Sequence, residues 1–258
     1  MLLGWVFLGL ILAASAWASP GREVAPAGGQ PTFVEFKRHK RNYLISGTPN
    51  TKGQLSFRVP VVRDTGHYLA YSQSLIWELF TESSSPVTDV NFNPEYFYRF
   101  RLGERGPLRE FDLGVEHRSN GGKYEESRGW NDVFVDLPFM HQLAGGGEVF
   151  VSFKPFWIFG KDENNPDVHE WIGWYEFEVA GRGFLRQWLD YDEVYLQLRP
   201  GGKEGGRFSK GGLEVGLRFK VFPGESSPHA FIQWFSGYGE SQLRYRQETH
   251  ALRAGFSI

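Results

Sequence analysis

The clearest pattern in this chain is an alternation of apolar and polar residues with a period of two. Between positions 210 and 221, apolar residues occupy every second position, and Glu214, Arg218 and Lys220 fall between them. The segment from Glu170 to Ala180 repeats this alternation. Because successive side chains of a strand point to opposite faces, the pattern predicts strands with one apolar and one polar face.

Twelve segments fit this description: 36–47, 52–62, 67–79, 94–103, 109–119, 131–141, 147–159, 169–182, 185–199, 210–222, 228–243 and 247–257. Many exceed the usual strand length of about 5–6 residues and suit a tilted bilayer crossing of about 9–11 residues. Short turns are expected near 63–66, 104–107, 142–146, 183–184 and 223–227, and longer loops at 80–93, 120–130, 160–168 and 200–209. Such alternation is typical of outer-membrane barrels, and an even strand number lets the sheet close without exposed edges.

We therefore predict an all-β fold, a twelve-stranded antiparallel transmembrane β-barrel. The alternative is a soluble lipocalin-like barrel or a β-sandwich, whose strands would place their apolar residues inside. Here charges alternate with large aromatic residues, which suits a polar lumen and a lipid-facing wall. The 23 Phe, 11 Tyr and 9 Trp also supply enough rings for interfacial girdles.

The first residues differ from the rest of the chain. Positions 2–18 are uncharged and apolar, and they end in the cleavage-like pattern Ala16-Trp17-Ala18. We interpret 1–18 as a signal peptide, although it lacks the usual basic residue near its start; a retained anchor is the alternative. Residues 19–35, rich in Pro and Gly, are expected to form a flexible periplasmic leader, and 36–258 the barrel.

Charge and cysteine content exclude several classes of site. The formal net charge is −2 with both signs interspersed, so no broad basic surface for nucleic acid is implied. The chain has no cysteine, which excludes disulfides and thiolate-bound zinc. The acidic run at 161–167 contains Asn165-Pro166, and we interpret it as a turn with solvated charges rather than a cation site.

Candidate chemistry lies in one predicted hairpin. His117 and Ser119 share a strand face with Leu113 and Val115, and Asn131 opens the next strand on its apolar face. In a barrel with a polar lumen the apolar faces meet lipid. The three polar side chains are therefore expected on the outer wall, near the end that carries the longer loops.

Serine, histidine and asparagine in this arrangement can perform nucleophilic catalysis. A serine hydroxyl needs an adjacent base such as histidine, and that base needs a third group to orient its ring. An asparagine carbonyl can do this without placing a charge beside the bilayer. The alternative is that these are polar residues at the end of a hairpin, which is the usual meaning of an isolated H-x-S pair. The chain contains no G-x-S-x-G motif that would indicate another esterase site.

A family resemblance bears on this choice. The sequences VEHRSNG at 115–121 and SRGWN at 127–131 resemble the signature of outer membrane phospholipase A. Further similar blocks occur in the same order at 71–74, 77–79, 83–86, 154–156, 165–167 and 236–241. The resemblance implies a twelve-stranded barrel with Ser119 as nucleophile, His117 as general base and Asn131 as the group that orients it.

The resemblance also implies a cofactor and a partner. It implies Ca²⁺ bound by the Ser127 side chain and the Gly122 carbonyl, with the carbonyl of Ser84 supplied by a second copy of the chain. Gln73 matches a residue buried in the dimer interface. The expected protein is a calcium-dependent phospholipase A1/A2 and lysophospholipase of a Gram-negative outer membrane. It would act on membrane phospholipid as a homodimer, with its site towards the outer leaflet.

Three departures from the family pattern stand out. Gly122 replaces a common arginine, which should matter little for a main-chain ligand. Asp132 stands where a basic residue is usual, which could alter loop electrostatics or lipid preference. The chain ends in Ile258 rather than an aromatic residue. Two rival functions remain: a non-enzymatic porin-like or adhesin barrel, and a soluble secreted esterase.

Overall fold

The computed structural model describes residues 36–62, 65–80, 83–185, 191–202, 207–221 and 227–258. The predicted signal peptide and leader lie outside these residues. Within the described residues, no helix has the length and apolar character needed to cross a membrane.

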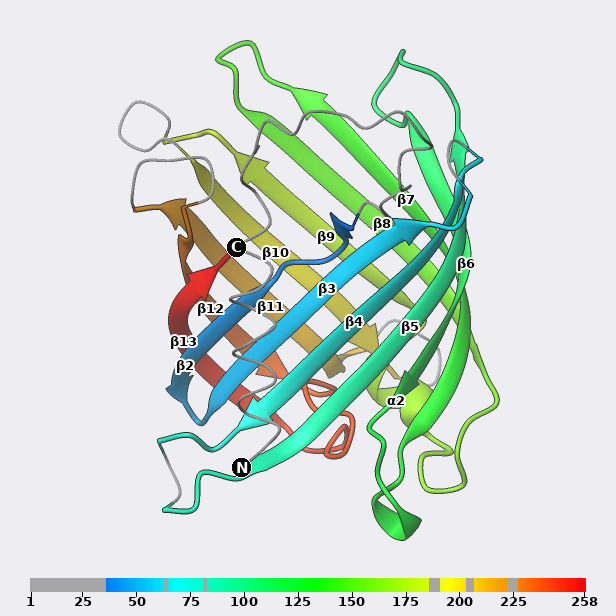
Figure 1. Ribbon diagram of the computed structural model, residues 1–258, viewed down its shortest axis with the longest axis vertical. Coiled ribbons are helices and arrows are strands. Elements are labelled where there is room, and N and C mark those ends of the chain that lie inside the picture. Colours follow the sequence, from blue (N-terminus) through cyan, green and yellow to red (C-terminus); the bar gives the residue numbers. More distant parts are fainter. Residues whose placement is uncertain (1–35, 63–64, 81–82, 186–190, 203–206, 222–226) are drawn as a thin grey trace, which may run out of the picture.

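Twelve antiparallel strands form a closed barrel (Figure 1). Each strand pairs with its neighbours in sequence, and pairing of the last strand with the first completes the ring. The strands are β2 (Tyr43–Thr48), β3 (Thr51–Pro60), β4 (His67–Trp77), β5 (Val87–Arg101), β6 (Glu110–Ser119), β7 (Gly129–Gln142), β8 (Glu148–Phe159), β9 (Tyr175–Arg182), β10 (Asp192–Gly201), β11 (Arg207–Lys220), β12 (His229–Gly237) and β13 (Thr249–Ser257). The predicted fold class is confirmed.

The two faces of the wall differ as the alternation predicted. On β6, Asp112 and Glu116 are buried in the lumen, while Leu113 and Val115 are 43% and 44% exposed on the outside. The exterior is therefore apolar and the interior charged, the reverse of a soluble barrel. A lipid environment explains this inversion, because apolar side chains that face lipid are not exposed to water and carry little free-energy cost.

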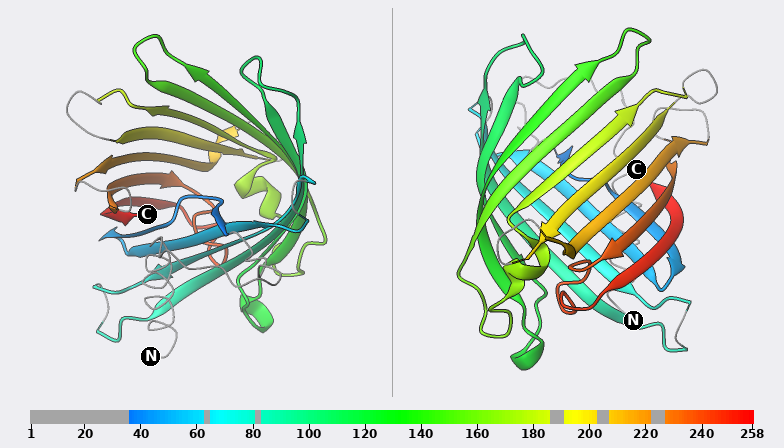
Figure 2. Two further views of the ribbon diagram at one scale, coloured as in Figure 1. Left: turned by 45° about the horizontal axis from the view of Figure 1, so that its top comes forward. Right: turned by 180° about the vertical axis from the view of Figure 1, so that it is seen from behind.

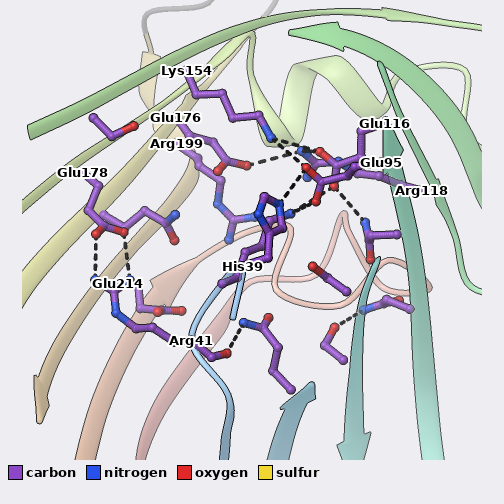
Figure 3. Close-up of a pocket in the computed structure, with 18 of the residues that line it drawn as sticks. His39, Arg41, Glu95, Glu116, Arg118, Lys154, Glu176, Glu178, Arg199 and Glu214 are labelled. Carbon is purple, nitrogen blue, oxygen red and sulfur yellow. Dashed lines mark hydrogen bonds and ion pairs between the residues drawn. The ribbon is translucent and has the colours of Figure 1, made fainter. Parts of the chain in front are cut away.

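Ion pairs and a small apolar cluster fill the interior. A polar cavity of about 410 Å³ lies among charged side chains such as Glu95, Glu116 and Lys154 (Figure 3). Fully buried Arg218 contacts fully buried Glu193 at 3.2 Å. Buried charges persist only when they are paired in this way. Rings including Phe97, Trp130 and Phe134 form a cluster inside the barrel.

The strand predicted at 36–47 is interrupted. A short β1 (Lys37–Arg38) and the later β2 both pair with β3, and the residues between them leave the wall and enter the lumen. There Lys40 Nζ lies 2.5 Å from Glu95 Oε1, and Arg41 makes two hydrogen bonds to Glu178 of 2.7 and 2.9 Å. Consecutive basic residues cannot alternate between lumen and lipid, so these internal ion pairs prevail over regular strand pairing.

The prediction of a strand at 169–182 is partly wrong. Its first part is the helix α2 (Val168–Ile172), which lies within the ring at the long-loop end (Figure 2), and β9 begins only at Tyr175. Val168 and Ile172, four residues apart, are both buried in the internal cluster. A helix places such residues on one face, and the apparent period of two concealed this spacing.

Several strand ends also differ from prediction. The strand β12 ends at Gly237 rather than near 243, because 238–248 folds over the lumen, where Ser241 Oγ donates to Asp89 at 2.7 Å. The strand β10 begins at Asp192, whose carboxylate accepts the N–H groups of Phe184 and Leu185 at 3.0 Å. The strand expected from 185 therefore begins only at Asp192, and the connection after β9 is longer than predicted. The strand β5 begins at Val87, earlier than predicted, and shortens the preceding loop.

A clasp joins α2 to the loop at 238–248. Tyr245 and Arg246 both donate hydrogen bonds to the Asp167 carboxylate, at 2.6 and 2.7 Å. Partial burial raises the pKa of Asp167, but hydrogen bonds from Arg246, Tyr245 and Trp171 outweigh it and hold that pKa well below its ordinary value. The clasp therefore stays charged and intact throughout the neutral pH range.

Candidate active site

The end of β6 and the start of β7 bring the predicted triad together. In the ladder between these strands, His117 lies opposite Asn131 and Ser119 lies opposite Gly129. Parity places His117 and Ser119 on the outer face with exposed Val115, while Glu116, between Val115 and His117, is buried. The residues thus lie on the outer wall at the long-loop end, where the sequence predicted them.

His117 and Asn131 are in direct contact. His117 Nδ1 lies 2.9 Å from Asn131 Oδ1. Because the amide oxygen can only accept, Nδ1 carries the hydrogen and Nε2 is left as the basic atom. The hydrogen bonds of the described residues do not include one from Ser119 Oγ to His117. Such contacts often tighten only when substrate is bound.

Gly160 provides the space that Asn131 occupies. Phe159 is the partner of Asn131 on β8, and Gly160 follows it with a φ of +57°. A Cβ at position 160 would lie 2.8 Å from Asn131 Nδ2, which is closer than carbon and nitrogen can approach. The absence of a side chain here keeps the Asn131 amide in place against His117.

Substituting Gly160 by alanine should therefore lower the catalytic rate about tenfold or more, since the Asn131 amide must move away from His117. Gly106→Ala is the matched control, because Gly106 also has a positive φ (+89°) but no atom within 4 Å of its Cβ position. The rates of both variants should be measured on the phospholipid substrate that the resemblance implies. Equal activities for the two variants would show that the clash does not matter.

Gln73 lies in line with Ser119 on the outer wall. In the strand register, Gln73 pairs with Phe92 on β5, and Phe92 pairs with Ser119 on β6. Two strand spacings separate Gln73 from Ser119, which corresponds to about 10 Å. Its amide is a polar group on an otherwise apolar face, next to Tyr71, whose hydroxyl donates to it at 3.4 Å.

The loop at 120–128 is shaped by one asparagine. Asn120 Oδ1 accepts the N–H groups of Gly122 and Arg128 at 3.1 and 2.8 Å, and its Nδ2 donates to the Glu126 carbonyl at 2.8 Å. These bonds fix the backbone on both sides of the loop, and with it the positions of Gly122 and Ser127.

Asp162 is a residue that the sequence interpretation missed. Ser127 Oγ donates to Asp162 Oδ2 at 2.7 Å, and the Asn164 N–H donates to Oδ1 at 3.1 Å. The hydrogen bond from Ser127, followed by that from Asn164, lowers the pKa of Asp162. Position 162 is thus no purely solvated turn residue. The signal in the sequence was an oxygen-rich run at the same end of the barrel as Ser127.

The oxygen atoms around Ser127 fit a hard cation. A hydroxyl, an ionised carboxylate and backbone carbonyls are the ligands that Ca²⁺ prefers. The described residues contain no group of three His, Cys, Asp or Glu side chains that could hold a metal, so a site here would rely on hydroxyl and carbonyl oxygens beside Asp162. Ser84 is exposed near the tip of the loop between β4 and β5, at the same end of the barrel.

Asp132 was expected to alter loop electrostatics or lipid preference, and it lies on the lumen face of β7. It is fully buried in the lumen, directly behind Asn131, and its Oδ2 lies 3.2 Å from Arg118 Nε. Its carboxylate faces away from lipid and from the loop at 120–128. Any effect of Asp132 on the nearby triad must therefore act through its contacts inside the barrel.

A second serine–histidine pair lies on the outer wall, and the sequence did not suggest it. Ser236 Oγ is 2.9 Å from His250 Nδ1, and His250 Nε2 is 3.7 Å from Glu248 Oε1. The two residues pair across β12 and β13, so only the strand register reveals them. His250 has a side chain that is 66% exposed. This pair is the natural competitor of the predicted triad for catalytic function.

A comparison with models of known protein families shows to which family the chain is related. A family model described as phospholipase A1 matches residues 29–258, which includes every strand of the barrel. The chain belongs to the phospholipase A1 family.

Individual relatives agree with this membership. Phospholipase A1 of Salmonella typhimurium is 29% identical over 180 residues, covering 68% of this chain and 56% of the relative. A putative phospholipase A1 of Neisseria meningitidis serogroup B is 25% identical over 245 residues, covering 90% of this chain and 58% of the relative. The matched part thus spans less than two thirds of the length of these curated relatives.

Solved structures show the same barrel in this family. The outer membrane phospholipase dimer of Salmonella typhi, with bound calcium, superposes with a TM-score of 0.72 at 24% identity, covering 90% of this chain and 94% of that one. Outer membrane phospholipase A of Escherichia coli gives 0.71 at 25% identity, covering 86% and 98%. This member of the phospholipase A1 family is accordingly a β-barrel protein of a Gram-negative outer membrane.

Proposed function

We propose that this chain is a calcium-dependent outer-membrane phospholipase that hydrolyses the acyl esters of glycerophospholipids and lysophospholipids. The observation that carries the proposal is the 2.9 Å hydrogen bond between His117 and Asn131 beside Ser119. It leaves a basic ring nitrogen next to a hydroxyl on a wall that faces lipid. Relatives named phospholipase A1 support the choice of substrate.

The reaction follows from the roles of the three side chains. Ser119 Oγ attacks the ester carbonyl carbon as His117 Nε2 takes its proton, and Asn131 Oδ1 holds the opposite N–H of the imidazolium. Collapse of the tetrahedral intermediate expels the lysophospholipid alkoxide, which takes the proton from His117. Water then attacks the acyl-serine with His117 again as base. Fatty acid is released and Ser119 recovers its proton.

The position of the triad defines how substrate arrives. Leu113 and Val133 are exposed on the outer wall of the triad strands themselves, where acyl chains can lie against them. An ester group near the membrane surface would reach Ser119 laterally from the outer leaflet. Entry through the lumen is not needed.

Calcium has a place in this proposal because the donor set near the triad fits it. Ser127 Oγ, the Asp162 carboxylate and the Gly122 carbonyl would hold the ion, and the carbonyl of Ser84 from a second copy would complete the set. When bound, the ion supplies positive charge that stabilises the developing oxyanion. A dimer that packs its outer walls together would also cover Gln73 and shelter its amide from lipid.

The refolded chain should release fatty acid and lysophospholipid from phospholipid in detergent micelles that contain calcium. The products can be separated by thin-layer chromatography. A chain that releases neither product, but conducts ions in planar bilayers, would be a porin-like barrel instead.

A further inference from the structure

Arg118 connects the triad strands to their neighbours from inside the barrel. It lies between His117 and Ser119 in the chain and points the opposite way, into the lumen (Figure 3). Its guanidinium lies 3.2 Å from Asp132 on β7 and 3.6 Å from Glu176 on β9. It also lies 5.6 Å from the centre of the Phe156 ring on β8. One side chain therefore touches three strands besides its own.

These contacts are buried and hence rigid. Glu116 and Asp132 have no exposed side-chain surface, and the Arg118 side chain is 11% exposed. Glu116 accepts a further contact of 3.0 Å from Arg118, and Lys154 Nζ lies 3.1 Å from the same carboxylate group. In such surroundings a charge that loses its partner is strongly disfavoured, so each group holds its neighbour in one position. The planar guanidinium adds directionality that an ammonium lacks.

The ion pairs and the triad share one stretch of backbone. Asp132 directly follows Asn131, and Arg118 directly follows His117, so each ion-pair residue sits one position from a triad residue on the opposite face. The His117–Asn131 hydrogen bond requires β6 and β7 to keep their register and spacing. The ion pair between Arg118 and Asp132, called the clamp below, fixes the register and the spacing of the two strands within one residue of that hydrogen bond.

We propose that Arg118 is a positioning residue of the active site, which rests on the function proposed above. Its ion pairs with Asp132 and Glu176 hold β6 and β7 from inside, so that His117 stays bonded to Asn131 with Ser119 beside it. The Asp132 carboxylate, an unusual residue at this position by family resemblance, is the anion that completes the clamp.

Another arginine on the same face provides a matched control. Arg99 donates two hydrogen bonds of 2.8 Å to Asp112 and contacts Glu110 at 2.8 Å, and its side chain is 14% exposed. It thus resembles Arg118 in burial and in being paired with more than one carboxylate. Its partners lie at the start of β6, seven or more residues from Ser119 and more than about 20 Å away at strand spacing.

The test compares Arg118→Met, Arg118→Lys and Asp132→Asn with Arg99→Met in the full chain, with excess calcium and a short-chain ester below its micelle concentration. We expect Arg118→Met to lower kcat at least tenfold with KM within twofold of wild type, and Arg118→Lys to recover part of the loss. We expect Asp132→Asn to lower kcat about threefold or more, and Arg99→Met to stay within twofold. Folded barrel is measured for each variant by its heat-dependent mobility in detergent gels.

The outcomes separate the two proposals. Wild-type kcat in Arg118→Met, or an equal fall in Arg118→Met and Arg99→Met, would overturn the clamp while leaving the triad intact. A loss confined to KM would overturn it as well. If Arg118→Met does not fold, Asp132→Asn decides, and its wild-type kcat would overturn the clamp. Full activity of Ser119→Ala would instead overturn the proposed function itself.

Discussion

Ser119→Ala should lower phospholipid hydrolysis about 10⁴-fold or more, whereas Ser236→Ala should leave it within about twofold of wild type. Loss of the nucleophile removes the acyl-enzyme route altogether, since no other hydroxyl lies beside His117 in the register of β6 and β7. Ser236 is a strong control because it already contacts a histidine at 2.9 Å on the same outer wall. Both variants keep their fold-defining backbone bonds.

The two variants show which of the two serine–histidine pairs on the outer wall is catalytic, the pair at Ser119 or the pair at Ser236. If Ser236→Ala lost activity and Ser119→Ala kept it, the catalytic group would be the pair on β12 and β13. The measurement is fatty-acid release at saturating calcium, together with labelling of the reactive serine by a sulfonyl fluoride. Label should attach to residue 119 and disappear in Ser119→Ala.

Removal of calcium should abolish activity, and Asp162→Asn should raise the calcium concentration for half-maximal activity at least about tenfold. The Asp162 carboxylate accepts a 2.7 Å hydrogen bond from the Ser127 hydroxyl and would contribute the full negative charge of the cation site. Its neutral amide keeps the shape but not the charge. Activity should be titrated with calcium after treatment with EDTA.

Glu163→Gln is the matched control for this titration. It removes the same charge one position away, on an exposed side chain. We expect its calcium dependence to remain within about twofold of wild type. A similar shift in both variants would mean that the loop acts through its overall charge and that Asp162 is not a ligand. Activity that persists in EDTA would contradict calcium dependence as such.

The sequence predicted those features that depend on a single strand. Alternation along β6 predicted which side of the wall Val115 and Glu116 occupy, and the structure agrees. The same parity argument placed His117 and Ser119 outside. A period of two is a local property of one strand. In a membrane barrel every outward position faces lipid, so the apolar and polar residues alternate along the whole strand.

Features that depend on partners far along the chain could not be predicted. The entry of Lys40 into the lumen depends on Glu95 and Glu116, which lie on other strands. The contact of Ser127 with Asp162 joins two loops, and the Ser236–His250 pair exists only through the register of β12 and β13. Alternation carries no information about such pairings. The short helix α2 escaped detection because two buried positions are too few to define a helical period.

The two basic residues that enter the barrel, Lys40 and Arg41, have a consequence for the order of assembly. Lys40 and Arg41 are bonded to carboxylates on β5 and β9, strands on different sides of the ring, while the adjacent β2 completes the seam with β13. We expect the wall from β3 to β13 to curve around this segment before the seam closes. Barrel formation would then wait for the first strand and the last to meet, with Lys40 and Arg41 already enclosed.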